Sequence, residues 1–279
     1  MNTTSFAVRP ASLASSRRLA LASIVVSLAA TFGLGATAAH AQNALEAITK
    51  SKKIRIAVPT DYPPYGLVGK DLKPQGLDID MANYVAAKLG ATVELVPVTS
   101  ANRIPYLQTG KVDMIISTLG KTPEREEVVD FTHSYSPFFQ AIFAPKKMVV
   151  KSWADLAGKT VSVTRGAMAD TELEKVMPVG TQVRRFEDHV GTVSAFTSGQ
   201  VMVIATSAGE GGTIMHRNPE LNTEYKLTLK DSPNFMGVNK GETALKNRLN
   251  EIILEATKNG TIDKLCVKWL GRPAGTLPL

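Results

Sequence analysis

Cysteine is almost absent from this chain, which has 279 residues and only Cys266. No internal disulfide can form from a single thiol. Cys266 lies at helical spacing with Leu265 and Trp269, a pattern typical of a buried and unreactive thiol. We therefore expect neither a disulfide-stabilised fold nor cysteine chemistry.

Metal-binding and nucleic-acid-binding patterns are also missing. The four histidines have no paired spacing and no second cysteine accompanies them, so we expect no metal and no cofactor. Lysine and arginine are scattered, and no run is long enough to predict a nucleic-acid surface.

The first forty-one residues have the layout of a secretory signal. Arg17 and Arg18 precede the apolar run LALASIVVSLAATFGLG, and Ala39-His40-Ala41 supplies the small residues of a cleavage site. We expect cleavage after Ala41, so that residues 1–41 are a signal peptide. The alternative is an uncleaved membrane anchor, which a run of about 17 residues could barely provide.

The mature chain would have 238 residues, enough for one large domain or two of ordinary size. Losing the signal lowers the net charge from +7 to +4, because three arginines leave with it. The residue directly after the cleavage point is Gln42 and not a cysteine, which argues against a lipid anchor. We therefore expect a soluble, exported protein.

The first part of the mature chain alternates strands with helices. We predict strands at 53–58, 92–98 and 112–117, helices at 77–90 and 104–110, and a Tyr-Pro-Pro-Tyr turn at 62–65. Strand-helix-strand units with short loops imply a parallel sheet covered by helices on both faces.

A second set begins after the apolar segment FFQAIFAP. We predict helices at 152–159, 169–177 and 190–199, strands at 160–166, 181–187 and 200–206, an extended segment at 227–241, and final helices at 242–260 and 262–271. The chain therefore contains a second α/β unit.

Six segments spread over nearly the whole mature chain carry a further pattern. They are VPTDYPPYG, GLDIDMANYVAAKLG, NRIPYLQTGKVDMIIS, the T-P-E-R-x-x-x-V-D-F run at 122–131, SWADLAGKTVSVTRG and NGTIDKLCVKWLG. In this order they resemble the periplasmic amino-acid-binding proteins of ABC importers, solute-binding protein family 3. No segment is specific alone, but their shared order makes the resemblance strong.

The resemblance implies an α/β fold of the two-lobe periplasmic binding protein type (type II). Each lobe would be a central sheet flanked by helices, with the ligand in the cleft between them. Lobe 1 would comprise residues 43–138 and 237–279, and lobe 2 residues 139–236. Two hinge crossovers, near 137–141 and 232–237, would absorb the backbone change when the lobes close.

The resemblance also implies a site for a ligand carboxylate. Arg125 matches the arginine that pairs with the ligand α-carboxylate, and a guanidinium suits this role because it makes two charge-assisted bonds and stays charged when desolvated. Thr118 matches a donor to the same carboxylate, and Tyr62 matches an aromatic residue that packs on the ligand stem. The alternative for Arg125 is a surface arginine paired with a neighbouring glutamate.

Three residues resemble the glutamate/aspartate-binding branch of the family. Ser100 and Arg103 match a pair that contacts a ligand side-chain carboxylate, and His189 matches a lobe 2 histidine that reaches the ligand. Two alternatives stay open, with Arg103 bonding loops of its own lobe and His189 as a structural histidine.

Three positions depart from the family pattern. Ser207 stands where most members have an aspartate for the ligand ammonium, Gly120 stands where they have a hydroxyl, and Arg165 adds a cation before the lobe 2 loop. An ammonium buried without a carboxylate is costly. Either Glu210, Asp61 or Glu187 replaces the aspartate, or the ligand has no ammonium.

The implied function is a non-catalytic one. A monomeric periplasmic receptor would capture a small amino acid or related carboxylate, with an acidic amino acid favoured, and deliver it to the permease subunits of an ABC importer. One alternative is a cyclohexadienyl dehydratase-like enzyme using His189, Glu187 or Glu210, and another is a binder of ammonium-free dicarboxylates. A membrane-receptor sensor domain is disfavoured, because the chain ends at Leu279 without a membrane segment or kinase.

Overall fold

The structure is a computed structural model that describes residue 1 and residues 43–278. The expected signal peptide and its cleavage site after Ala41 therefore lie outside the described residues, apart from Met1. In the described part of the chain, no helix is both long and apolar enough to cross a membrane.

The first sheet has five strands in the order β5-β1-β6-β13-β7. Their bounds are Lys53–Val58 for β1, Thr92–Pro97 for β5, Met114–Leu119 for β6, Val129–Ser136 for β7 and Asn234–Asn239 for β13. β1 runs parallel to β5 and to β6, with Ile56 opposite Leu95 on one side and Met114 on the other. β13 returns from the far end of the chain and pairs antiparallel with β6 and β7.

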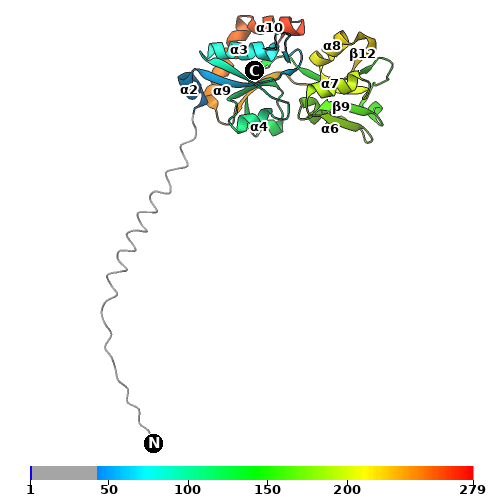
Figure 1. The fold of residues 1–279 in the computed structure, drawn as a ribbon, viewed down its shortest axis with the longest axis horizontal. Helices are drawn as coiled ribbons and strands as arrows, with labels where there is room; N and C mark the ends of the chain where they lie inside the picture. The colour runs from blue at the N-terminus through cyan, green and yellow to red at the C-terminus, as the bar shows by residue number, and fades with distance from the viewer. Residues whose placement is uncertain (2–42, 279) are drawn as a thin grey trace, which may run out of the picture. The chain divides into compact units, whose positions relative to one another are not determined.

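Helices cover the first sheet on both faces. They are α2 (Ala44–Ser51), α3 (Leu77–Lys88), α4 (Arg103–Gln108), α5 (Pro123–Glu126), α9 (Thr243–Lys258) and α10 (Thr261–Leu270). Figure 1 shows α3 and α10 on one side of this sheet and α4 on the other. Cys266 of α10 is fully buried, as predicted, and burial raises its pKa to about 12.

The second sheet also has five strands, in the order β10-β9-β11-β8-β12. Their bounds are Phe139–Pro145 for β8, Thr160–Thr164 for β9, Gln182–Phe186 for β10, Val203–Ser207 for β11 and Thr223–Asp231 for β12. Its helices are α6 (Met168–Val176), α7 (His189–Thr197) and α8 (Ala208–Arg217), with short 3-10 turns η1 (Trp153–Leu156) and η2 (Pro219–Leu221). A small third sheet contains β2 (Asp61–Tyr62), β3 (Gly66–Val68) and β4 (Pro74–Gln75).

The apolar segment at the start of the second unit is a central strand. In β8, Ile142 packs in one cluster with Leu173 of α6, while Phe143 packs in another with Ile214 of α8. Successive strand residues point to opposite faces, so a strand covered on both sides needs apolar residues throughout. This explains why FFQAIFAP shows no alternation.

The expectation of parallel sheets is right only in part. The parallel pairs are β1 with β5 and β6, and β9 with β10 and β11. β13 and β8 instead pair antiparallel with their neighbours. The difference arises because the chain passes from one sheet to the other between β7 and β8 and returns between β12 and β13. The lobe boundaries and hinge positions given above remain predictions.

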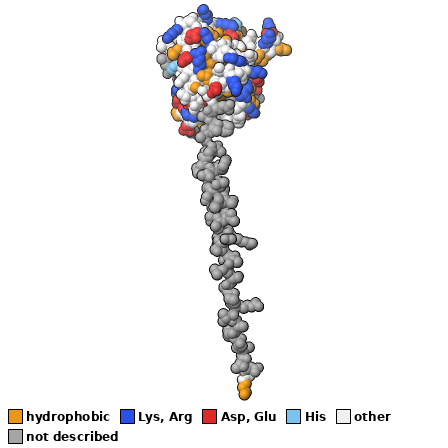
Figure 2. All heavy atoms as spheres, turned by 90° about the vertical axis from the view of Figure 1, so that its left-hand side faces the viewer, with side chains coloured by type: hydrophobic (Ala, Val, Ile, Leu, Met, Phe, Trp, Pro, Cys, Tyr) orange, Lys and Arg blue, Asp and Glu red, His pale blue; other side chains and the backbone are white. Residues whose placement is uncertain are grey.

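On the face shown in Figure 2, Lys and Arg side chains are spread among acidic and apolar ones. This agrees with the scattered basic residues of the sequence.

Two neighbouring glycines of α8 should respond differently to alanine. A Cβ on Gly211 would lie 2.2 Å from Cζ of the buried Phe143, whereas a Cβ on Gly212 would meet nothing within 4 Å. We expect Gly211→Ala to lower the free energy of unfolding by about 1–3 kcal/mol, because the ring must move in a packed core. We expect Gly212→Ala to be neutral or stabilising by up to about 1 kcal/mol, because alanine favours the helix.

Urea unfolding followed by circular dichroism measures both variants. Equal shifts for the two substitutions would contradict the packing of α8 against Phe143.

Candidate functional site

The predicted site residues come from the carboxyl ends of strands. Ser100 follows β5 and Thr118 lies near the end of β6. In the second sheet, Gly166 follows β9, His189 follows β10 and Ser207 ends β11. Neighbouring parallel strands share one carboxyl edge, and open α/β sheets bind their ligands there. Hydrogen bonds join residues at the carboxyl edges of the two sheets.

Arg103 and Arg125 converge on one oxygen atom. Nη2 of Arg103 donates to the carbonyl oxygen of Gly166 at 3.3 Å, and Nη2 of Arg125 donates to the same oxygen at 3.1 Å. Gly166 follows β9 of the second sheet, whereas Arg103 and Arg125 lie in α4 and α5 beside the first sheet, so both guanidinium groups reach across to the second. One point between the sheets is therefore within reach of two cations.

Arg103 is held mainly by its own side of the site. It is 2% exposed; its Nε donates to the Ser100 carbonyl at 3.0 Å, and its Nη1 donates to the carbonyls of Ser117 at 2.6 Å and Thr118 at 3.0 Å. Burial, and after it the repulsion from Arg125, lowers the pKa of Arg103 to about 9. Because this pKa is still above neutral, the buried group keeps its charge at pH 7.

Arg125 is positioned by the short helix α5. The hydroxyl of Thr122 caps this helix by accepting from the Arg125 backbone N–H at 3.3 Å, and Pro123 occupies the first turn. Nη1 of Arg125 donates to the Gly120 carbonyl at 2.9 Å, and the side chain is half-buried. Burial lowers the pKa of Arg125 as well.

Thr118 has a backbone that L-residues rarely adopt, with a φ of 44°. The buried carboxylate of Asp78 accepts from the Thr118 N–H at 2.8 Å through Oδ2, and from the Tyr135 hydroxyl at 2.8 Å through Oδ1. The Thr118 carbonyl in turn accepts from Arg103. Asp78 thus fixes the strained residue that carries part of the arginine site.

Tyr62 and His189 form a stacked pair between the sheets. Their ring centroids lie 3.5 Å apart with an interplanar angle of 13°. The Tyr62 hydroxyl accepts from the backbone N–H of Ser207 at 3.2 Å. The backbone N–H of His189 donates to the Asp61 carboxylate at 2.9 Å. The Tyr62 side chain therefore contacts residues at the edge of the second sheet, with His189 on its ring face.

His189 is buried, and its two ring nitrogens contact different groups. Nε2 lies 3.3 Å from the Ser100 hydroxyl, while Nδ1 lies 3.2 Å from the Thr164 hydroxyl and 3.5 Å from a carboxylate oxygen of Glu210. The imidazole thus connects the arginine side of the site with a buried acid.

Two of the predicted residues, Arg165 and Gly120, have surroundings that differ from those of the others. The Arg165 guanidinium is about half exposed and pairs at 2.9 Å with Glu187, whose side chain is 76% exposed. Gly120 is buried, and a Cβ there would lie 2.2 Å from Cε of Met168, so this methionine of α6 covers it. The structure does not bring Arg165 into the group formed by the other predicted residues.

Three functional features were not predicted from the sequence. These are the buried Asp78, the Gly166 carbonyl as a shared acceptor, and the burial of Glu210, which was only one of three candidate acids. Asp78 stands two residues before Asp80 in the same helix, and the pattern alone does not distinguish them. A backbone carbonyl has no signal in the sequence at all.

Two cavities border this group. One of 210 Å³ is lined by Ser100, Arg103, Arg125 and Gly166, among others. The second, of 420 Å³, lies on the other side of the imidazole and is lined by residues that include Asp61, His189 and Glu210. Arg103 and Arg125 line the first cavity, and the second has both acids and the cation Arg217 in its lining.

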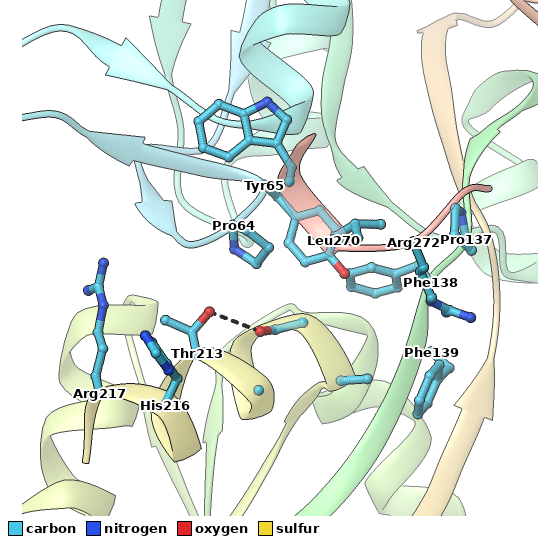
Figure 3. A pocket seen from close by; sticks show the side chains of 14 residues that line it. Pro64, Tyr65, Pro137, Phe138, Phe139, Thr213, His216, Arg217, Leu270 and Arg272 are labelled. Atoms are coloured by element: carbon cyan, nitrogen blue, oxygen red, sulfur yellow. Dashed lines mark hydrogen bonds between the residues drawn. The ribbon is translucent and has the colours of Figure 1, made fainter. Parts of the chain in front are cut away.

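A cavity of 670 Å³ lies elsewhere, on another side of α8 (Figure 3). Tyr65 and Phe138 line it with ring centroids 5.1 Å apart, and α8 contributes His216 and Arg217. None of the predicted site residues is part of its lining. Its larger volume alone does not make it the ligand site.

Among the residues that the structure describes, no three His, Cys, Asp or Glu side chains are grouped so that they could hold a metal ion.

Residues 54–272 match the family described as bacterial extracellular solute-binding proteins, family 3. The chain belongs to this family. The match covers all strands of both large sheets except the first residue of β1, so the α/β architecture described above is that of a family 3 protein.

Relatives of this family 3 protein are named as amino-acid-binding proteins. The glutamine-binding protein GlnH of the Bacillus subtilis (strain 168) ABC transporter is 30% identical over 82% of this chain and 85% of its own. An ancestral arginine-binding protein bound to arginine is 32% identical, with a TM-score of 0.75 over 79% of this chain and 99% of its own. Both relatives are named as binding proteins, and the solved structure of the second has the same fold as this chain.

A third relative bears on the enzymatic alternative. The ancestral amino acid-binding protein AncCDT-1, described as a precursor of cyclohexadienyl dehydratase, is 31% identical, with a TM-score of 0.73 over 81% of this chain and 98% of its own. It too is named as a binding protein.

The buried Asp78 should make stability depend on pH. Burial raises its pKa from 3.8 to about 7, so the folded protein retains a proton that the unfolded chain releases. The stabilisation is complete below pH 4 and is lost as the pH rises to about 7, a change of up to about 4 kcal/mol. We expect Asp78→Asn to reduce the fall in melting temperature between pH 5 and pH 8.

The exposed carboxylate of Asp71 provides the control for this measurement. Asp71→Asn should leave the fall in melting temperature as it is in the unsubstituted protein. An equal fall in the Asp78→Asn variant would show that Asp78 does not titrate in this range.

Proposed function

We propose that this family 3 protein is the substrate-binding protein of an ABC importer. In the periplasm, the monomer captures a small amino acid or related carboxylate between the two sheets and delivers it to the permease subunits. Family membership and the amino-acid-binding relatives support this function.

The observation that carries the proposal is the shared oxygen of Gly166. Both Arg103 and Arg125 direct an Nη2 atom at it, from 3.3 Å and 3.1 Å. A carbonyl carries only a partial charge, whereas a carboxylate oxygen at this point would form two charge-assisted bonds. A ligand carboxylate at this position would therefore form stronger bonds to the two arginines than the Gly166 carbonyl does.

Arg125 is the main anchor in this proposal. Its guanidinium has one bond to Gly120 and one to Gly166, and it is half-buried at the edge of the 210 Å³ cavity. Thr118 lies behind it with its hydroxyl 3.4 Å from Nη1 of Arg103. Tyr62 supplies the apolar surface for the ligand stem once His189 moves off its face.

An acidic amino acid is the ligand class that we favour. Two cations line one cavity together with the hydroxyl-bearing Ser100, and a second ligand carboxylate would balance the second charge. Arg103 already bonds three carbonyls of its own side, so what it offers a ligand is chiefly its Nη2 atom. A neutral amide such as that of glutamine would make weaker bonds there.

A thermal-shift screen tests the proposed function directly. L-glutamate, L-aspartate, L-glutamine, L-arginine and succinate form the panel, and a compound at a hundred times its dissociation constant should stabilise the protein by about 2.7 kcal/mol. We expect a dissociation constant in the micromolar range or below for the best amino acid, equivalent to about 8 kcal/mol. Failure of every panel member to bind would overturn the proposed function.

Arginine substitutions separate the two proposed roles. Calorimetry should show that Arg125→Ala weakens every panel ligand by about 100-fold or more, because the carboxylate loses one of its two charge-assisted bonds and the nearby cation. Arg103→Lys keeps the charge but loses the planar fork, and should weaken L-glutamate more than L-glutamine. Arg248→Ala, at an exposed ion pair on α9, is the control and should change neither affinity.

Equal weakening of L-glutamate and L-glutamine by Arg103→Lys would reject the preference for an acidic ligand. It would leave the role of Arg125 as it stands.

A dehydratase activity is the second candidate function. The likeness to a dehydratase precursor and the buried Glu210–His189 contact at 3.5 Å favour it. Incubation of the purified protein with prephenate or arogenate decides between the two. We expect no turnover of either compound, and turnover abolished by His189→Ala would replace the binding function with the enzymatic one.

A further inference from the structure

The 670 Å³ cavity beside α8 lies outside the arginine site and borders both units of the fold (Figure 3). Tyr65 and α10 line it from the side of the first sheet, and α8 lines it from the side of the second. Phe138 lies between them, where the chain passes from β7 to β8. Cavities of about 300–1,000 Å³ are typical of small-molecule sites. The volume is therefore sufficient for a small organic compound.

Aromatic side chains form much of the cavity wall. Tyr65 and Phe138 are 2% and 3% exposed, and their ring centroids lie 5.1 Å apart at an interplanar angle of 66°. Phe139 and Trp269 are half-buried and also line the cavity. Trp269 is held in place because its Nε1 donates to the Asp80 carboxylate at 2.7 Å. Rings that are already fixed lose little entropy when a ligand contacts them, so this wall suits a planar aromatic compound.

The lining of this cavity contains basic side chains and neither aspartate nor glutamate. Arg217 and His216 of α8 and Arg272 after α10 are exposed at its rim. Figure 3 shows Arg217 and Arg272 at opposite ends, with the rings of Tyr65 and Phe138 between them. Among residues 43–278, neither arginine forms an ion pair. Both also border neighbouring cavities, whose linings include the acids Asp61, Glu210 and Asp231. A bound anion would therefore meet two cations that no carboxylate of the described residues already holds.

Gly212 keeps the α8 side of the cavity open. It lies inside the helix, where glycine is less favourable than alanine. A Cβ on Gly211 would lie 2.2 Å from Phe143, and one on Gly209 would lie 2.8 Å from the Tyr65 hydroxyl oxygen. A Cβ on Gly212 would meet nothing within 4 Å. Packing thus accounts for the other two glycines of α8, whereas the missing side chain at Gly212 leaves free volume in the cavity.

We propose that this cavity is a second binding site, which takes an aromatic compound bearing an anionic group such as a carboxylate. The ring system lies against Tyr65 and Phe138, and the anion lies near Arg217 or Arg272. The site is separate from the arginine pair at Gly166, so the inference goes beyond the proposed function and does not depend on it.

Two compounds that share a ring system and differ in charge test this proposal. The probes are 1-naphthaleneacetate, an anion, and 1-naphthaleneacetamide, which is neutral. In calorimetric titrations at low ionic strength, the unsubstituted protein should bind the acetate with a dissociation constant below about 1 mM. It should bind the acetate at least about 5-fold more tightly than the acetamide. Because both arginines are exposed, about 0.5 M sodium chloride should reduce this preference.

Charge-removing variants test the role of the two arginines. The double variant Arg217→Gln, Arg272→Gln should weaken the acetate until it binds within about 2-fold of the acetamide, and should leave the acetamide unchanged. Arg248→Gln, at an exposed ion pair on α9, is the control and should change neither affinity. An equal loss in the control would show a general attraction by positive charge and would overturn the site.

A larger side chain at Gly212 tests the location. Gly212→Leu should fill the α8 side of the cavity and weaken both compounds by at least about 10-fold, whereas the matched Gly212→Ala should bind both within about 3-fold of the unsubstituted protein. Leucine and alanine both favour a helix, so a fold defect does not explain a difference between them. Equal affinities in the two variants would reject this cavity as the site.

The remaining outcomes separate this inference from the proposed function. If the acetate does not bind the unsubstituted protein, the inference is overturned, while the amino-acid panel still tests the proposed function. If the acetate and the acetamide bind equally, the anionic class is rejected. Loss of acetate binding in Arg125→Ala but not in Gly212→Leu would place the compound at the arginine site and overturn the second site.

Discussion

The buried guanidinium of Arg103 is the constraint on which the site depends. A buried cation needs an acceptor for its N–H groups, and Arg103 takes the carbonyls of Ser100, Ser117 and Thr118 on its own side. These bonds fix the loop after β5 and the end of β6 relative to each other. Nη2 of Arg103 donates to the Gly166 carbonyl, which also accepts from Nη2 of Arg125. The repulsion between the two cations is tolerable because an oxygen lies between them, which is also why an anion suits this position.

Other charged and polar side chains support the pair formed by Arg103 and Arg125. Asp78 supports Thr118 in a strained conformation, and Thr118 supplies one of the carbonyls that hold Arg103. Beyond the Tyr62–His189 stack, a carboxylate oxygen of Glu210 lies 3.5 Å from Nδ1 of His189. Buried polar side chains therefore continue from the arginines to α8.

Local patterns in the sequence predicted most elements well. The apolar and β-branched run of β1 gave its bounds without error, and α3 and α9 end within two residues of the glycines expected to stop them. The helix α8 was missed, because three glycines among its ten residues oppose a helix by propensity. Its glycines become understandable only from the packing, since any side chain at Gly211 would collide with Phe143. In α8, tertiary packing therefore overrides the low helix propensity of glycine.

The sequence by itself determined the family, through six ordered segments, and it singled out Arg125 and Arg103 as the residues to consider for an anion. Only the tertiary structure decided what these arginines meet. The Gly166 carbonyl is 63 residues from Arg103 and 41 from Arg125, and a backbone oxygen has no side chain to mark it. The structure likewise decided that Glu210 is buried while Glu187 is exposed. Burial depends on contacts such as that of Tyr62 with Ser207, which lie 145 residues apart, and no local pattern records them.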